Sequence, residues 1–376
     1  MKLLLVNHEY PPVGAGAATA THAMAYELSA LGHEVVVLTA RYGDLARHSL
    51  EEAVVVKRIR CARRRADRSN LFEMLTFVLS ALFRLRSILR KHQPNGLIIF
   101  FSLPSGPIGV VAKLSFGLPY VVSLRGGDVP GLVPELNLIH TTLAPLRRFV
   151  LKQARAIVAN SEGLRELAEA ADGYRVQVVP NGVDTEFFQP PPPSELRPDS
   201  TFRVLFVGRF QGQKNLNLLF TQLARLPRGT FQLHLVGDGP EKERLHDLGH
   251  ELQIADSIIW HGWISRLALP AIYQTVDCLV NPSLYEGMPN VVLEAMACGL
   301  PVIASNVPGN AELVVNGETG FLFDLEQPAT LLEAINHFLN DRMLALKLGT
   351  NGRARVIAKF SWRSVAQAYA LMMKES

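Results

Sequence analysis

A chain of 376 residues is longer than one ordinary hydrophobic core supports, so its length favours two domains. Apolar residues make up 48% and charged residues 19%, which excludes an intrinsically disordered chain. The formal net charge is +4, and the three cysteines form no CxxC pair, which argues against a zinc site or a disulfide framework and fits a reducing cytosol.

Short apolar runs alternate with helical segments through the first half of the chain. Such runs suit a parallel sheet covered on both faces, and the helices between them indicate βαβ units. The opening run MKLLLVN is too short for the apolar core of a signal peptide, and no run is long enough to span a membrane. We therefore expect a cytoplasmic protein. The predicted strands cover residues 2–7, 33–40, 95–101, 119–125 and 154–161.

The stretch from Lys57 to Lys91 is the most basic part of the chain, with KRIRCARRRADR followed by FRLRSILRK. It could meet an acidic acceptor or an anionic membrane surface, which would place the protein on the inner face of a membrane. The alternative is a solvated face with a basic helix end. Interleaved aromatic residues and nucleic-acid-binding motifs are missing from this stretch, so we expect no nucleic-acid partner.

A proline-rich stretch, FFQPPPPSELRPDST, divides the chain. Consecutive prolines favour an extended path and exclude a helix or a central strand. Residues 189–200 are therefore predicted to link a domain of residues 1–188 to a domain of residues 201–361. The alternation then restarts, with predicted strands at residues 202–209, 231–239, 257–263, 276–283 and 300–305.

Three glycine-containing turns follow predicted strands. Gly14 to Ala17 precede a helix, where glycine lets backbone amides approach a phosphate. Their spacing is not GxGxxG, so an NAD site is poorly supported, and a tight turn without a ligand is the alternative. Gly208 ends a strand before Arg209 and Lys214, two cations that suit a pyrophosphate; a surface loop with ordinary charges is the alternative, and the Walker spacing is absent. The turn Gly237 to Gly239 is interpreted as an ordinary helix start.

The stretch NPSLYEGMPNVVLEAMACG places two carboxylates around a helix start in otherwise apolar sequence. Glu286 lies in the loop after a predicted strand, and Glu294 lies about one turn into the helix. One carboxylate can accept hydrogen bonds from sugar hydroxyls, and the other can bridge the two hydroxyls of a vicinal diol. The alternatives are a solvent-facing Glu294 and a Glu286 that pairs with the helix dipole, although an unpaired buried carboxylate is costly. An anion would meet the free amides of Asn290, Val291 and Val292.

Taken together, these motifs resemble the retaining glycosyltransferases of family 4, which have the GT-B fold. The resemblance covers nearly the whole chain and is most specific in the second half. It implies an α/β architecture of two Rossmann-like domains facing across a cleft, with a final helix of residues 362–376 crossing back to the first domain. The second domain would bind a nucleotide-diphosphate sugar, and the first most of the acceptor. The motifs are VPNGVD, FVGRFQGQKN, LVGDGPEKERL, EGMPNVVLEAMACGLPVIAS and VPGNAELVVNGETGFLF.

The resemblance also implies roles for particular residues. Arg209 and Lys214 would bind the diphosphate and stabilise the leaving group, Glu286 would contact the transferred sugar, and Glu294 would hold the ribose hydroxyls. Gly16 would approach the diphosphate from the first domain. The remaining donor-binding positions are Gly208, Gly287, Met288, Pro289, Asn290 and Val291.

The reaction implied by the resemblance moves a hexosyl or related sugar to an acceptor hydroxyl with retention of configuration. The acceptor would be a sugar, a lipid-linked sugar or a glycolipid in cell-envelope synthesis. Cations and helix amides can stabilise the departing diphosphate, and no Asp-x-Asp stands in a strand-end loop, so we predict no metal and no cofactor beyond the donor substrate. A sugar-nucleotide epimerase of the same fold and a non-catalytic sugar-nucleotide binding module are the alternatives. The intact set of Arg209, Lys214, Glu286 and Glu294 argues against the binding module.

The loop SLRGGDVPG departs from the family pattern, because many relatives carry a histidine where this chain has Arg125. Arginine stays protonated and cannot act as a base, although it could orient the sugar or bind an acidic acceptor. Asp128 is our candidate catalytic residue in this loop. A structural ion pair between Arg125 and Asp128 is the alternative.

Overall fold

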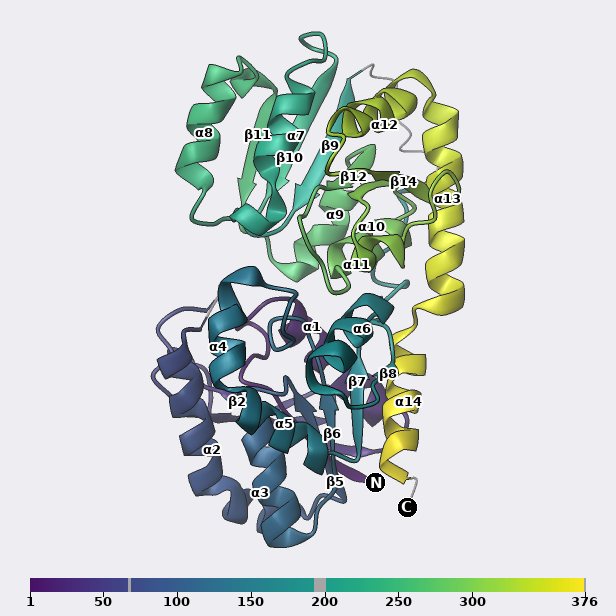
Figure 1. The fold of residues 1–376 in the computed structure, drawn as a ribbon. Coiled ribbons are helices and arrows are strands. Elements are labelled where there is room, and N and C mark those ends of the chain that lie inside the picture. The colour runs from purple at the N-terminus through teal and green to yellow at the C-terminus, as the bar shows by residue number, and fades with distance from the viewer. Residues whose placement is uncertain (67–68, 193–200, 375–376) are drawn as a thin grey trace. The chain divides into compact units, whose positions relative to one another are not determined.

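The structure, a computed structural model, describes residues 1–66, 69–192 and 201–374. The chain forms two compact units, each built around its own sheet (Figure 1). The first combines residues 1–182 with residues 362–374, and the second comprises residues 183–361. Two α/β units in series agree with the alternation of strands and helices in the sequence.

The first unit contains an eight-stranded sheet in the order β3-β4-β2-β1-β5-β6-β7-β8. Every pairing is parallel except that of β3 with β4. Buried strands β1, β5 and β6 lie at the centre, as expected from their unbroken apolar sequences. The strands are β1 Lys2–Val6, β2 Glu34–Ala40, β3 His48–Glu51, β4 Val54–Ile59, β5 Gly96–Phe100, β6 Tyr120–Ser123, β7 Ala156–Ala159 and β8 Gln177–Val178.

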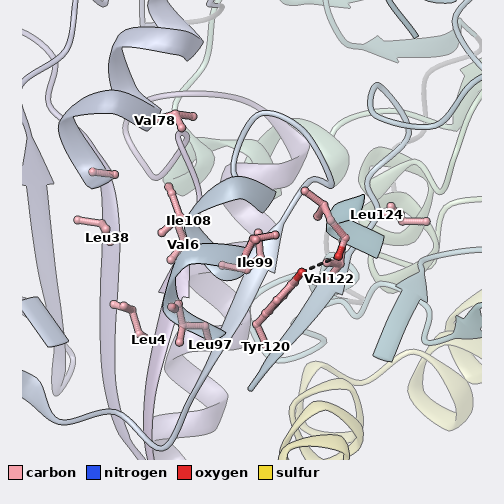
Figure 2. Packing of buried hydrophobic residues seen from close by; sticks show 14 of the residues in the cluster. Leu4, Val6, Leu38, Val78, Leu97, Ile99, Ile108, Tyr120, Val122 and Leu124 are labelled. Carbon is pink, nitrogen blue, oxygen red and sulfur yellow. Dashed lines mark hydrogen bonds between the residues drawn. The ribbon is translucent and has the colours of Figure 1, made fainter. Parts of the chain in front are cut away.

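Helices cover both faces of this sheet, because successive strand residues point to opposite sides. Leu4 and Val6 belong to the core shown in Figure 2, where the Tyr120 hydroxyl donates a hydrogen bond to the Val150 carbonyl. Leu3 and Leu5 belong to the core on the other side, which includes residues of α1 and α14. The helices are α1 Gly16–Ala30, α2 Leu71–His92, α3 Gly106–Phe116, α4 Asn137–Thr142, α5 Ala144–Gln153, α6 Glu162–Asp172 and α14 Trp362–Lys374.

Helix α14 is the part of the first unit that comes from the far end of the sequence. Its residues Trp362, Val365 and Tyr369 are buried in the same core as Leu3 and Leu5. The Tyr369 hydroxyl lies 2.7 Å from the Ser123 hydroxyl at the end of β6. We expected a helix over residues 362–376; residues 375–376 of that range lie outside the described residues.

The second unit contains a six-stranded, all-parallel sheet in the order β11-β10-β9-β12-β13-β14. Its strands are β9 Phe202–Val207, β10 Phe231–Val236, β11 Ile258–Gly262, β12 Cys278–Asn281, β13 Val302–Ser305 and β14 Gly320–Phe323. Its helices are α7 Leu216–Leu223, α8 Lys242–Glu251, α9 Leu269–Tyr273, α10 Asn290–Ala297, α11 Pro308–Ala311, α12 Ala329–Asn340 and α13 Arg342–Lys359.

The boundary between the units differs from the expected domain end at residue 188. Residues 183–188 belong to the second unit, because Val183 pairs with Ser361 and donates a 2.9 Å backbone hydrogen bond to Phe360. Phe188 is fully buried and packs edge-on against Tyr273, with ring centroids 5.8 Å apart. Of the predicted linker at residues 189–200, residues 193–200 lie outside the described residues.

No helix within the described ranges is long and apolar enough to cross a membrane.

Candidate functional site

A loop from Gly208 to Lys214 follows β9 and carries two of the predicted cations. Phe210 donates a 3.0 Å hydrogen bond to the Asp238 carbonyl, and a Cβ atom on Gly239 would lie 2.6 Å from the Phe210 nitrogen. The glycines of the turn after β10 therefore have a structural reason: they let the Gly208–Lys214 loop approach. Arg209 is half-buried within this loop.

Lys214 meets Glu286, which comes from the loop after β12. The lysine Nζ lies 2.5 Å from Glu286 Oε1, and only 15% and 9% of the two side chains are exposed. The Ser283 hydroxyl lies 2.8 Å from the same carboxylate oxygen. This partner for Glu286 is a lysine side chain, in place of the helix dipole considered as an alternative.

Backbone contacts also join these two loops. Leu284 donates a 2.8 Å hydrogen bond to the Gln213 carbonyl, and the Gln213 side-chain amide donates a 2.8 Å bond to the Tyr285 carbonyl. Strands β9 and β12 are parallel neighbours, so their carboxyl ends lie at one edge of the sheet. Ligands of open parallel sheets bind at such an edge.

A buried polar network supports the Glu286 loop, and the sequence did not identify it. The Asn281 amide donates a 2.9 Å bond to Asn310 Oδ1, and the Asn310 amide donates a 3.0 Å bond to the Ser305 carbonyl. A Cβ atom on Gly309 would lie 2.6 Å from the Glu286 carbonyl oxygen. The motif VPGNAE contributes to the family resemblance, but the sequence assigns no role to its Gly309 and Asn310.

Helix α10 begins at Asn290, after Pro289, in agreement with the predicted start. Our expectation of a free amide at Val292 is wrong. Its N–H donates a 3.2 Å hydrogen bond to the Pro289 carbonyl, which also accepts a 3.4 Å bond from Leu293. The tight first turn, closed on the proline carbonyl, takes these donors away from any ligand.

Glu294 is buried, so the alternative of a solvent-facing side chain is wrong. The Tyr273 hydroxyl donates a 3.0 Å hydrogen bond to Glu294 Oε2, and Arg266 Nη1 lies 3.9 Å from Oε1. Burial raises the pKa of Glu294 to about 7, although Arg266 and the Tyr273 hydrogen bond favour the ionised form. The carboxyl is therefore able to donate as well as accept hydrogen bonds near neutral pH.

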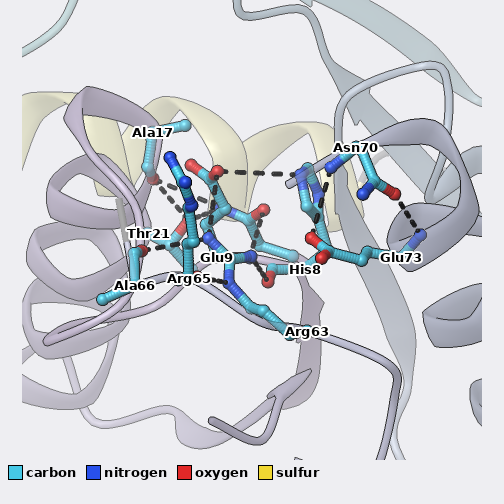
Figure 3. Close-up of polar contacts among 10 residues, drawn as sticks. His8, Glu9, Ala17, Thr21, Arg63, Arg65, Ala66, Asn70 and Glu73 are labelled. Carbon is cyan, nitrogen blue, oxygen red and sulfur yellow. Dashed lines mark hydrogen bonds and ion pairs between the residues drawn. The ribbon is translucent and has the colours of Figure 1, made fainter. Parts of the chain in front are cut away.

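In the first unit, the predicted Gly14–Ala17 turn leads into α1, which begins at Gly16. Gly14 has a φ of 99°, and a Cβ atom there would lie 2.6 Å from the Cβ of Glu9. Its N–H donates a 2.8 Å bond to the Ala66 carbonyl. Arg63 contacts the same carbonyl at 3.1 Å (Figure 3). The turn is thus held in place by the segment before α2.

Two arginines of the basic stretch from residue 57 to residue 91 lie inside the first unit. Arg63 is buried and donates hydrogen bonds to the carbonyls of His8, Arg65 and Ala66. Arg58 is also buried and pairs with Glu51 at 2.8 Å. These two arginines hold the first unit together and do not contribute to a basic surface.

The alternative of a side-chain ion pair between Arg125 and Asp128 is wrong. Arg125 Nη1 donates a 2.7 Å bond to Asn181 Oδ1, and its guanidinium lies 4.7 Å from the centre of the Phe100 ring. The Asp128 carboxylate accepts backbone bonds from Ser102 at 2.6 Å and Arg125 at 2.9 Å. Both oxygens therefore hold the loop, and burial raises the pKa of this carboxyl. A catalytic role for Asp128 stays a prediction.

Within the part of the chain that the structure describes, no group of three or more His, Cys, Asp and Glu side chains is placed to hold a metal ion.

Two family models match the chain and together span most of it. Residues 15–182 match the glycosyl transferase 4-like domain, and residues 190–355 match the glycosyl transferases group 1.

Curated relatives and a solved structure extend this likeness. The GDP-mannose-dependent alpha-(1-6)-phosphatidylinositol monomannoside mannosyltransferase of Mycobacterium tuberculosis is 31% identical, over 76% of this chain and 77% of its own. The UDP-Gal:alpha-D-GlcNAc-diphosphoundecaprenol alpha-1,3-galactosyltransferase of Escherichia coli is 33% identical, over 75% of this chain and 76% of its own. The sucrose-phosphate synthase structure from Thermosynechococcus elongatus has a TM-score of 0.86 and 25% identity, and covers 99% of this chain and 98% of its own.

Proposed function

The chain belongs to the group 1 glycosyl transferases and has the GT-B fold, and from this premise we propose a metal-independent, retaining transfer of a sugar from a nucleotide-diphosphate donor to an acceptor hydroxyl. The observation that carries the proposal is the contact of Lys214 with Glu286 at the carboxyl ends of β9 and β12. In this proposal the carboxylate binds the sugar and the cation meets the diphosphate, at the sheet edge where ligands of open parallel sheets bind.

The donor contacts follow from the chemistry of these side chains. Glu286 Oε1 is engaged by Lys214 and Ser283, which leaves Oε2 without a hydrogen bond to any described residue. That oxygen can accept a bond from a hydroxyl of the transferred sugar. Lys214 and Arg209 supply positive charge for the diphosphate as it departs. Glu294, with its raised pKa, can accept one ribose hydroxyl bond and donate another.

The reaction would pass through an oxocarbenium-like state while negative charge develops on the departing diphosphate. Fixed cations stabilise that charge most when they stand in place before the reaction begins. The Lys214–Glu286 contact holds the ammonium in this way. We assign retention to attack on the face from which the diphosphate leaves, with a phosphate oxygen taking the proton of the acceptor hydroxyl.

The acceptor we propose is a sugar carried on a lipid or a glycolipid, in cell-envelope synthesis at the cytoplasmic face of a membrane. Two relatives support this class, because their names specify a phosphatidylinositol mannoside and a diphosphoundecaprenol-linked sugar as acceptors. The same two names specify GDP-mannose and UDP-galactose as donors, so the proposal covers nucleotide sugars with either base.

A donor screen tests the proposed reaction. The protein is incubated with UDP-, GDP- and ADP-sugars, with and without lipid-linked acceptors, and the released nucleotide is measured. We expect one donor to be hydrolysed slowly, and to be consumed faster when an acceptor is present. Proton NMR should show that the product linkage keeps the anomeric configuration of the donor. A chelator should leave the rate unchanged. Formation of an epimer of the donor would support the alternative of a sugar-nucleotide epimerase. Donor binding without turnover would support the alternative of a non-catalytic binding module.

A further inference from the structure

Helix α2, Leu71–His92, is apolar on two opposite faces. One face is buried in the core of the first unit, through residues that include Phe77, Ala81 and Leu85. Four apolar side chains on the other face are exposed, at intervals of three and four residues that align them along a helix. We call them the α2 stripe: Phe72 is 63% exposed, Leu75 54%, Leu79 58% and Phe83 90%.

The stripe continues into positive charge at the carboxyl-terminal half of the helix. Arg86 and Arg90 are exposed and fall on the same line, three and seven residues beyond Phe83. The only acidic residue of the helix, Glu73, is buried, and its carboxylate accepts bonds from the N–H groups of Arg64 and Asn70 at 3.2 Å. The exposed face of α2 therefore offers apolar and cationic groups without a carboxylate.

We propose that the α2 stripe seats the first unit on an anionic lipid surface. Phe72, Leu75, Leu79 and Phe83 would enter the acyl boundary of the bilayer, and Arg86 and Arg90 would contact the phosphates of its headgroups. Amphipathic helices bind membranes through this combination of buried apolar area and attraction to anionic lipids. A second copy of the chain fits less well, because its own α2 would bring the same arginines and no exposed carboxylate to pair with them.

This surface lies within the basic stretch from residue 57 to residue 91 and narrows it to α2, because Arg58 and Arg63 of that stretch are buried. It also rests on the proposed function and deepens it, since it gives the acceptor a lipid-bound location. The amino end of α2 is joined to the Gly14 turn by the Ala66 carbonyl, which accepts bonds from Gly14 and Arg63.

Co-sedimentation with vesicles, in the absence of donor and acceptor, tests the proposal. Vesicles of phosphatidylcholine are compared with and without phosphatidylglycerol. We expect wild type to bind the anionic vesicles, and the double variant Leu79→Ser with Phe83→Ser to bind them at least about tenfold more weakly, since each side chain buries apolar surface. Arg86→Gln with Arg90→Gln should lose the preference for anionic lipid. Leu346→Ser, an exposed leucine of α13, is the matched control and should bind as wild type.

A spectroscopic probe reports insertion directly. In Phe83→Trp, the added fluorescence should shift to shorter wavelength on anionic vesicles and be quenched by brominated acyl chains. Equal vesicle binding by wild type and the stripe variant would overturn the proposal. A second result would also overturn it: light scattering that shows a dimeric wild type and a monomeric Phe83→Ser variant, with unchanged vesicle binding. The α2 stripe would then contact a second copy of the chain.

Failure of the lipid-binding proposal can be distinguished from failure of the proposed transfer reaction. The stripe variants should hydrolyse a water-soluble donor at the wild-type rate, because no stripe residue is among the proposed donor-binding residues, all of which except Gly16 lie in the second unit. Loss of vesicle binding with normal hydrolysis is therefore the expected pattern. Normal vesicle binding without any turnover would count against the transfer reaction alone.

Discussion

Lys214 and Glu286 are 72 residues apart in the sequence, and the lysine Nζ lies 2.5 Å from the glutamate Oε1. The two side chains come from the loops after neighbouring parallel strands. Because little of either side chain is exposed, each charge depends on the other for its partner. The contact thus serves both the stability of the two loops and the electrostatics of the proposed site.

Lys214→Ala should abolish turnover, with kcat reduced at least about 10²-fold, because the developing charge of the diphosphate loses a fixed cation. The free energy of unfolding should fall by about 1–3 kcal/mol, since the buried Glu286 carboxylate is left without its charged partner. Urea unfolding and donor hydrolysis measure the two effects. Lys242→Ala is the control, because Lys242 lies on the surface with its Nζ 3.8 Å from Asp238. Wild-type hydrolysis by Lys214→Ala would refute the site assignment.

Glu286→Gln should also abolish turnover while the fold stays intact. Glutamine keeps the volume of the side chain and can still accept a bond from Ser283, but it removes the negative charge beside the sugar. Circular dichroism should match that of wild type, and donor hydrolysis should be lost. A folded Glu286→Gln protein with normal kcat would show that the carboxylate is not required.

The raised pKa of Glu294 predicts how stability changes with pH. Below the ordinary value of 4.5 the carboxyl is protonated in both the folded and the unfolded chain, so it adds no pH dependence. Between 4.5 and about 7 the unfolded chain ionises first, so the folded state binds more protons and its stability falls as pH rises. The loss should approach about 3 kcal/mol and level off above the folded-state pKa.

Urea titrations of wild type and Glu294→Gln across this pH range measure the effect. The difference in unfolding free energy between the two proteins should shift in favour of the glutamine variant as pH rises, because glutamine carries no charge to desolvate. A difference that is constant with pH would mean that the Glu294 carboxyl titrates normally in the folded protein.

Gly309→Ala tests whether the Glu286 loop depends on the close approach of α11. The added Cβ would lie 2.6 Å from the Glu286 carbonyl oxygen, so the loop must move. We expect kcat to fall at least about tenfold and stability to fall by about 1–3 kcal/mol. Gly352→Ala in α13 is the matched control, because its nearest neighbour would lie at 3.5 Å. Equal activity of the two variants would argue against the dependence.

Asp128→Asn separates the two roles considered for this residue. An asparagine offers one acceptor oxygen where the carboxylate accepts bonds from both Ser102 and Arg125. The lost acceptor should lower the unfolding free energy by about 1–3 kcal/mol, and a catalytic Asp128 should also be required for turnover at temperatures where the variant is folded. A folded Asp128→Asn protein with normal turnover would limit Asp128 to holding the loop.

Much of this architecture could be predicted from the sequence. The strands were recognised because unbroken apolar runs such as KLLLV and GLIIF have few other uses, and the helix at Asn290 was recognised from its proline and its length. Lys214 and Glu286 could be identified as candidate site residues through the family resemblance. Their direct contact could not, because it depends on β9 and β12 being neighbours, which no local pattern specifies.

The missed features share a physical cause. The sequence suggests surface charge at Arg58 and Arg63, yet both are buried: Arg58 pairs with Glu51, and Arg63 donates to three backbone carbonyls. The role of Gly309 rests on two carbonyl oxygens, those of Glu286 and Gly287, which would lie too close to a Cβ atom at this position. Such long-range fits leave no periodic signal, so a single sequence does not reveal them.

Helix α14 has a consequence for how the protein is made. The first unit needs Trp362, Tyr369 and Met373 to cover apolar residues such as Leu3 and Leu5, which are synthesised long before them. Its sheet and α1 can form early, but that face stays only partly covered until the whole second unit has been synthesised. The unit synthesised later can thus finish folding first, while β1 waits for α14.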